Sequence, residues 1–233
     1  MIDGIFLTGT DTGVGKTLVA GLLARYLKRR DVSVVTQKWV QTGCVGVSED
    51  IETHLKIMGV NGADVAEHIA MISPYILTYP ASPHLAAERD KKTIEPSKII
   101  KAYKALSAKF EHVVVEGAGG WLVPISRKAT CADVVKEMLL PVLIVAENRL
   151  GAINHTLLTI ESVRSKGLNV LGVVFNRISG DGDEHLLEDN KRIVSEITGV
   201  NVLGELAFSA DMDELVNSFS GIGDKYIDLV SKK

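Results

Sequence analysis

The stretch FLTGTDTGVGKTLVAGLL, residues 6–23, decides how the rest of the sequence is interpreted. A short apolar run ends at a glycine, and a loop rich in glycine and threonine follows it. Lys16 and Thr17 then precede a segment with apolar residues at helical spacing. A strand, a glycine-rich loop and a helix in this order are typical of loops that bind phosphate groups. The sequence therefore predicts a phosphate-binding site around Lys16.

The loop departs from the usual spacing GxxxxGK[ST], because Gly9 stands one position too early while Gly15, Lys16 and Thr17 fit the end of the pattern. Gly13 and Gly15 still allow the backbone to turn its N–H groups toward phosphate oxygens. Lys16 would reach the β- and γ-phosphates of a nucleotide, and Thr17 would offer a hydroxyl to Mg²⁺. We interpret the stretch as a phosphate loop with altered spacing rather than as an ordinary glycine turn before a helix.

Composition places the chain among ordinary globular proteins, with 233 residues, 46% hydrophobic and 24% charged. The net charge of −3 argues against nucleic-acid binding, and no apolar run is long enough to span a membrane. Cys44 and Cys131 show no metal-ligand spacing and are expected to be reduced thiols. The start of the sequence, MIDGIFLTG, shows no secretory signal. We expect a soluble cytoplasmic protein in which residues 1–233 form a single P-loop nucleotide-binding α/β domain.

Apolar strand patterns alternate with helical patterns along the chain. The strands are expected at 2–8, 31–37, 110–116, 140–147, 169–175 and 200–204, and the helices at 17–30, 96–109, 130–138, 152–166 and 184–198. This alternation predicts an α/β protein with a three-layer P-loop NTPase-type fold, in which a mostly parallel central sheet has helices on both faces. The long region 41–95 is polar and is expected to be rich in loops.

Three charged residues are candidates to work with the loop. Glu116 is expected to end a buried strand at the same sheet edge as the loop, where a carboxylate could bind a metal ion. Asp50 is a second carboxylate candidate, although it could equally be a first-turn acid of a helix. Lys38 comes at the end of the second strand and could place its charge near a transferred phosphoryl group. Alternatively, its side chain could simply extend from the core into solvent.

Two further sites follow later strands. Gly151 begins a helix whose N-terminus could bind a carboxylate. Asn176 follows a strand, where its amide could read a base or, equally well, tolerate a left-handed turn. The spacing of His54, His84 and His155 does not indicate metal binding, and we assign these histidines no chemistry.

The motifs together resemble the dethiobiotin synthetase family. The similarity runs from TGTDTGVGKT to DKYIDLV, and between them lie QKWVQTG, SPYILTYPASPHLAAE, VVVEGAGGWLVPI, LPVLIVAENRLGAINHTLLT and GVVFNRI. The resemblance implies that ATP, CO₂ and 7,8-diaminopelargonic acid give dethiobiotin, ADP and phosphate, with Mg²⁺, in biotin biosynthesis. One amine takes up CO₂ as a carbamate, and a carbamate oxygen attacks the γ-phosphorus. The neighbouring amine then attacks the mixed anhydride, closes a cyclic urea and expels phosphate.

The resemblance also implies roles for individual residues. Lys16 and Lys38 would be catalytic, and Thr17, Asp50 and Glu116 would be the metal ligands. The nucleotide-binding set is Gly13, Val14, Gly15, Lys16, Thr17, Glu116, Gly119 and Asn176, with Asn176 at the adenine. The substrate-binding set is Thr12, Lys38, Thr42, Leu150, Gly151 and Asn154. The last three would bind the substrate carboxylate from the partner subunit, which implies a homodimer.

Four positions depart from the pattern of the family. Gly13 stands where relatives have glutamate, Trp39 replaces a proline after Lys38, and Arg149 replaces a lysine. Ala207 lies where a segment beside the adenine has a proline.

Two other functions use the same nucleotide fold. An amidotransferase-type synthetase, such as a cobyrinate amidase, would need a glutaminase domain with a reactive cysteine, and neither cysteine lies in a nucleophile-elbow sequence. A nucleotide switch or partitioning ATPase usually has an extra lysine early in the loop, where this chain has Gly9, Thr10 and Asp11. ATP turnover that requires a diamine would distinguish the synthetase from both alternatives.

Overall fold

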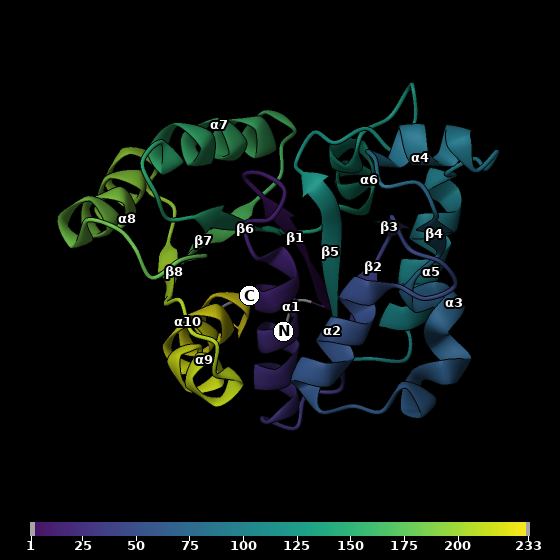
Figure 1. Cartoon of the computed structure of the whole chain (residues 1–233), viewed down its shortest axis with the longest axis horizontal. Helices are drawn as coiled ribbons and strands as arrows, with labels where there is room; N and C mark the ends of the chain where they lie inside the picture. The colour runs from purple at the N-terminus through teal and green to yellow at the C-terminus, as the bar shows by residue number, and fades with distance from the viewer. Residues whose placement is uncertain (1–2, 232–233) are drawn as a thin grey trace.

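A six-stranded sheet with strand order β2-β5-β1-β6-β7-β8 forms the centre of the computed structural model, which describes residues 3–231 (Figure 1). Its strands are β1 (Gly4–Gly9), β2 (Val34–Lys38), β5 (His112–Gly120), β6 (Val142–Glu147), β7 (Val170–Asn176) and β8 (Val202–Leu206). Neighbouring strands in this sheet are all parallel, which confirms the predicted sheet. The predicted start of the first strand at residue 2 lies outside the described residues.

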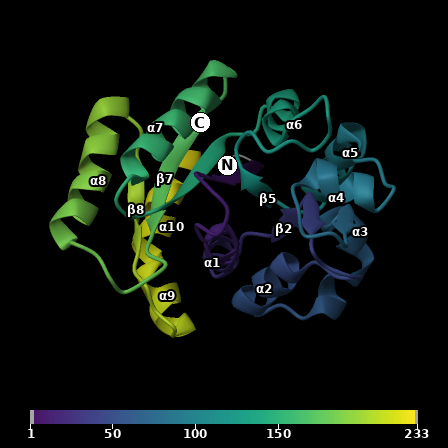
Figure 2. The ribbon, with the colours of Figure 1, turned by 45° about the horizontal axis from the view of Figure 1, so that its top comes forward.

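Helices cover both faces of the sheet (Figure 2). One face packs against α1 (Lys16–Lys28), α9 (Met212–Ser218) and α10 (Ser220–Ser231), and the other against α5 (Pro96–Ser107), α6 (Cys131–Met138), α7 (Ala152–Ser165) and α8 (Glu184–Thr198). Alternate residues of a strand point to opposite faces, so Ile5 and Leu7 join the core under α1 while Phe6 joins the opposite core. The predicted three-layer architecture is therefore confirmed.

Helix α1 is held in place by its apolar face. Val19, Leu22, Leu23 and Leu27 recur at helical spacing and are all buried. Each such side chain stabilises the fold by about 1.5–3 kcal/mol relative to an exposed position. This packing fixes the start of α1, and with it Lys16 and Thr17, against the end of β1.

The prediction of a loop-rich region at 41–95 is wrong. The segment contains most of β3 (Val40–Thr42), α2 (Glu49–Met58), the 3₁₀ helix η1 (Gly62–His68), α3 (Ile69–Ile72), β4 (Tyr75–Leu77) and α4 (Pro83–Arg89). Strands β3 and β4 pair in parallel as a separate small sheet. Apart from α2, which has ten residues, these elements are only three to seven residues long and are too short to produce a clear periodic pattern.

Strand β5 also differs from its prediction, because it continues past Glu116 to Gly120. A Cβ atom at Gly117 would lie 2.7 Å from the Phe6 ring and 3.2 Å from the Leu7 carbonyl oxygen. Glycine therefore lets β5 stay close beside β1 beyond Glu116, and that residue lies within the strand rather than at its end.

Within residues 3–231, none of the helices combines the length and the apolar character needed to cross a lipid bilayer. Cys44 and Cys131 are both free and buried.

Candidate active site

The start of α1, β2, β5 and α2 bring four of the predicted residues together. Lys38 and Glu116 are paired on neighbouring parallel strands, so their side chains lie on the same face. Thr17 stands in the first turn of α1 and Asp50 in the first turn of α2. Asp50 is thus both a first-turn acid and a member of the site, so the two interpretations of this residue are compatible.

Short polar contacts connect this group. The Lys38 Nζ atom lies 2.7 Å from Glu116 Oε1 and 2.5 Å from Asp50 Oδ2. It also donates to the Gly117 carbonyl oxygen at 3.3 Å. The Thr17 hydroxyl lies 3.0 Å from Glu116 Oε1 and 3.2 Å from Asp50 Oδ1. One hydroxyl, two carboxylates and one ammonium group therefore share a small volume beside the loop.

The charges of Lys38 and Glu116 depend on each other. Burial alone would lower the pKa of Lys38, but the carboxylates of Glu116 and Asp50 outweigh it and raise that pKa. Burial would likewise raise the pKa of Glu116, but the Lys38 charge and hydrogen bonds from His54 and Lys38 hold it below its usual range. Both groups are consequently ionised at neutral pH.

Lys16 has a different environment. Its Nζ atom donates to the Asp11 carbonyl oxygen at 3.0 Å, and its side chain is buried. Burial lowers the pKa of Lys16 to about 8, with the nearby Glu116 charge opposing that shift. An anionic phosphate at this position would favour the charged form of the lysine.

The donor set fits a hard divalent cation. A threonine hydroxyl and two carboxylates are oxygen ligands of the kind that Mg²⁺ prefers, and Mg²⁺ usually keeps water and substrate phosphates as its other ligands. Among residues 3–231, no group of three or more His, Cys, Asp or Glu side chains could hold a metal ion by itself. The residues present thus suit an ion that arrives with a nucleotide.

Asn176 packs against the phosphate loop. It is the last residue of β7, so the alternative of a left-handed turn is wrong. Its Nδ2 atom donates to the Val14 carbonyl oxygen at 3.0 Å, and its buried Oδ1 atom has no hydrogen-bond partner among the described residues. Gly15 has φ 94°, and a Cβ atom there would lie 2.1 Å from Asn176 Nδ2. Only glycine fits at position 15.

Thr12 lies on the exposed side of the same loop. A hollow of about 440 Å³ beside it is lined by residues 10–12, residues 120–124 and Leu158, Thr159 and Ser162 of α7. A Cβ atom at Gly119, which has φ 66°, would lie 3.6 Å from Thr12 Oγ1. The end of β5 and the loop therefore form one wall of this hollow and α7 the other.

The remaining substrate candidates lie apart from the carboxylate cluster. Thr42 ends β3 and is half-buried, while Leu150, Gly151 and Asn154 are exposed around the start of α7. Within residues 3–231, no hydrogen bond or ion pair connects any of the four to Lys38, Asp50 or Glu116.

His54 is the site residue that the sequence did not reveal. Its Nε2 atom lies 2.9 Å from Glu116 Oε2, and its side chain is completely buried. The available signal was its position one helical turn after Asp50 on α2, which only becomes informative once the region is known to be helical.

Known proteins resemble this chain over most of its length. A sequence model of the AAA domain family matches residues 3–215. The protein named ATP-dependent dethiobiotin synthetase BioD 2 from Haemophilus influenzae is 42% identical over 174 residues, covering 74% of this chain and 90% of the relative. ATP-dependent dethiobiotin synthetase BioD from Chlorobaculum tepidum is 35% identical over 222 residues, covering 91% and 92%. The chain belongs to the dethiobiotin synthetase family.

The fold of this dethiobiotin synthetase family member is shared more widely. The cell division ATPase MinD of Pyrococcus furiosus superimposes over 100% of this chain and 99% of its own, with a TM-score of 0.59 and 18% identity. At that identity the likeness concerns the fold alone.

Trp39 and Arg149, two of the positions expected to depart from the family pattern, make defined contacts. Trp39 is buried, its ring centroid lies 4.9 Å from that of Phe6, and its Nε1 atom donates to Gln37 Oε1. The indole thus anchors the backbone on the C-terminal side of Lys38. Arg149 Nε donates to Glu147 Oε2 and its NH1 group to the Leu150 carbonyl oxygen, both at 3.0 Å. The guanidinium group therefore braces the turn before α7.

The other two positions, Gly13 and Ala207, are exposed on the surface. Gly13 has φ 77°, and a Cβ atom there would meet nothing within 4 Å. Ala207 follows β8 on the surface. The structure offers no physical reason for glycine at position 13 or alanine at position 207.

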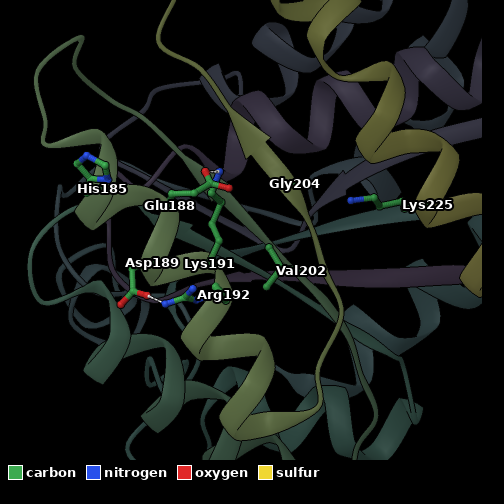
Figure 3. A pocket seen from close by; sticks show the side chains of 8 residues that line it. All are labelled: His185, Glu188, Asp189, Lys191, Arg192, Val202, Gly204 and Lys225. Atoms are coloured by element: carbon green, nitrogen blue, oxygen red, sulfur yellow. Dashed lines mark hydrogen bonds and ion pairs between the residues drawn. The ribbon is translucent and has the colours of Figure 1, made fainter.

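A separate hollow of about 770 Å³ lies between α8, β8 and α10 (Figure 3). Four of the charged side chains at its rim pair with each other, Lys191 with Glu188 and Arg192 with Asp189. None of its lining residues belongs to the site predicted from the dethiobiotin synthetase motifs.

Proposed function

We propose that this chain is an ATP-dependent dethiobiotin synthetase that forms the cyclic urea of dethiobiotin from 7,8-diaminopelargonic acid, CO₂ and ATP. The observation that carries the proposal is the contact of Lys38 with Glu116 at 2.7 Å and Asp50 at 2.5 Å, beside Thr17 and the phosphate loop. This arrangement combines a phosphate site with a fixed positive charge. We also infer that residues 1–233 act as one P-loop domain and that the enzyme works in the cytoplasm, where ATP is available.

The loop and the carboxylates would hold MgATP. Backbone N–H groups of the loop and Lys16 would bind the phosphates, and Thr17, Asp50 and Glu116 would hold Mg²⁺. The ion would neutralise phosphate charge when it is bound. Asn176 would read the adenine: its Oδ1 atom is buried without a hydrogen-bond partner among the described residues, and it would accept from the adenine amino group.

Lys38 would act on the reacting groups. Its neighbouring carboxylates keep it charged, and a charged lysine stabilises both the carbamate and the oxygens of the transferring phosphoryl group. The carbamate oxygen attacks the γ-phosphorus and ADP leaves. The second amine then attacks the carbonyl carbon, the C–O bond to phosphate breaks, and the five-membered urea closes.

The hollow beside Thr12 would accept the hydrocarbon chain of the substrate. Trp121, Leu122 and Leu158 offer apolar surface there, and Leu122 and Leu158 are exposed in the single chain. We infer a homodimer in which Leu150, Gly151 and Asn154 of the partner subunit bind the substrate carboxylate and Thr42 lies beside the carbamate.

A shared site can be tested with mixed dimers. Co-expression of Lys38→Ala and Asn154→Ala chains produces heterodimers with one site that contains both native residues. Turnover at low substrate should rise above that of either homodimer. The two chains carry different affinity tags, and dimers that bear both tags are isolated by two successive affinity steps. No rise in these heterodimers would place Asn154 in the same subunit as Lys38 or outside the site.

The function itself is tested by phosphate release from ATP with Mg²⁺ and bicarbonate, with and without 7,8-diaminopelargonic acid. We expect release only with the diamine, and a product with the mass of dethiobiotin. Release that ignores the diamine would favour a nucleotide switch instead.

A further inference from the structure

The two oxygens of the Glu116 carboxylate have separate partners. Oε1 faces the site, at 2.7 Å from Lys38 Nζ and 3.0 Å from the Thr17 hydroxyl. Oε2 points away from them, at 2.9 Å from His54 Nε2. The carboxylate is therefore held at both ends, and its plane cannot rotate without breaking a contact.

The His54 contact has a defined direction. An ionised carboxylate only accepts hydrogen bonds, so Nε2 carries the proton and donates it to Oε2. Nδ1 is buried and has no hydrogen-bond partner among the described residues. Glu116 is thus the hydrogen-bond partner that the structure gives the imidazole, which ties the orientation of the ring to the carboxylate.

Helix α2 supplies two side chains to the site, Asp50 and His54. Asp50 lies in its first turn and reaches Lys38, and His54 follows four residues later on the same face. Ser48 caps the helix by accepting from the Ile51 amide, and Gln41 Oε1 accepts from the Ser48 hydroxyl at 2.8 Å. These contacts fix the N-terminus of α2, and therefore the positions of Asp50 and His54 relative to Glu116.

We propose that His54 is a positioning residue, which holds Glu116 so that Oε1 faces Thr17 and the divalent cation of a bound nucleotide. The proposal rests on the proposed function for the identity of the reaction. His54 is completely buried, so it contacts neither substrate nor solvent and acts only through Glu116. Hydrogen-bond partners of metal ligands typically change metal affinity or activity by about 10–100-fold when they are removed.

The test uses three substitutions that differ in reach. His54→Gln can place an amide N–H where Nε2 lies, His54→Asn is polar but too short, and His54→Leu has no donor. Binding of Mn²⁺ is measured by electron paramagnetic resonance with a non-hydrolysable ATP analogue, together with thermal melting and the Mg²⁺ dependence of turnover.

We expect His54→Leu and His54→Asn to weaken Mn²⁺ binding by about 10-fold or more and His54→Gln to stay within about 3-fold of the native protein. Native-like Mn²⁺ binding by His54→Asn, or an equal loss in all three variants, would overturn the proposal and leave His54 a packing residue. If His54→Leu fails to fold, the Gln and Asn variants still decide the question. The Mn²⁺ measurement does not depend on product formation, which is measured separately with the native protein. Failure of the proposed function can therefore be distinguished from failure of the proposed role of His54.

Discussion

The two ends of the candidate site differ in burial. Lys38 and Glu116 are 5% and 1% exposed and are connected by short contacts, whereas Leu150 at the start of α7 is 78% exposed. Gly151 and Asn154 beside it are exposed as well. The groups proposed for phosphoryl transfer are therefore arranged within one chain, whereas the end proposed to recognise the carboxylate is exposed to solvent. A second subunit would cover that end.

Replacement of Lys38 should have the largest effect. Lys38→Ala removes the proposed charge at the carbamate, and we expect turnover to fall by about 10³ or more while ATP binding stays near normal, by analogy with catalytic arginine residues. Single-turnover phosphate release and binding of a fluorescent ATP analogue measure the two quantities. Lys98→Ala, which removes a lysine on α5 that donates to the Pro74 carbonyl oxygen, is the control. Near-normal turnover of Lys38→Ala would refute the role.

The phosphate loop gives the next largest effect. Gly15→Ala introduces a Cβ atom 2.1 Å from Asn176 Nδ2, whereas Gly13→Ala meets nothing within 4 Å. Both positions have positive φ, so both variants carry backbone strain of about 1–3 kcal/mol, and only the first also has a clash. We expect ATP affinity to fall at least about 10-fold more in Gly15→Ala. Equal losses would mean that the Asn176 contact does not constrain the loop.

At the exposed end, Asn154→Ala should raise the KM for the diamine by about 10-fold and change kcat much less, because it removes one hydrogen bond to a remote carboxylate. His155 is the next residue in the chain and is also exposed, so His155→Ala is the control for Asn154→Ala. Steady-state kinetics with varied diamine measure both constants. A larger fall in kcat than rise in KM would place the helix start in the chemistry.

The smallest effect is expected from Arg149→Lys. The lysine keeps the charge but cannot brace Glu147 and the Leu150 carbonyl oxygen together. Because 46% of the Arg149 side chain is exposed to solvent, we expect KM to rise by no more than about 3-fold. A rise comparable with that of Asn154→Ala would show that the guanidinium group binds the substrate directly.

Much of the fold follows from the sequence because buried parallel strands are long apolar runs. The cluster of Lys38 and Glu116 was also predictable, since residues on adjacent strands of such a sheet meet at one edge. Most elements of region 41–95 were not, because they are only three to seven residues long. His54 is 62 residues from Glu116 in the chain, and no local spacing encodes that contact.

If the phosphate loop holds ATP so that a carbamate oxygen attacks its γ-phosphorus, an oxygen atom of bicarbonate enters the released phosphate. The most direct measurement is the transfer of ¹⁸O from labelled bicarbonate into phosphate, sampled by mass spectrometry within the first turnovers, before exchange with water removes the label. We predict one ¹⁸O atom in the released phosphate for each dethiobiotin formed. Unlabelled phosphate from a reaction that still makes dethiobiotin would contradict the carbamate mechanism.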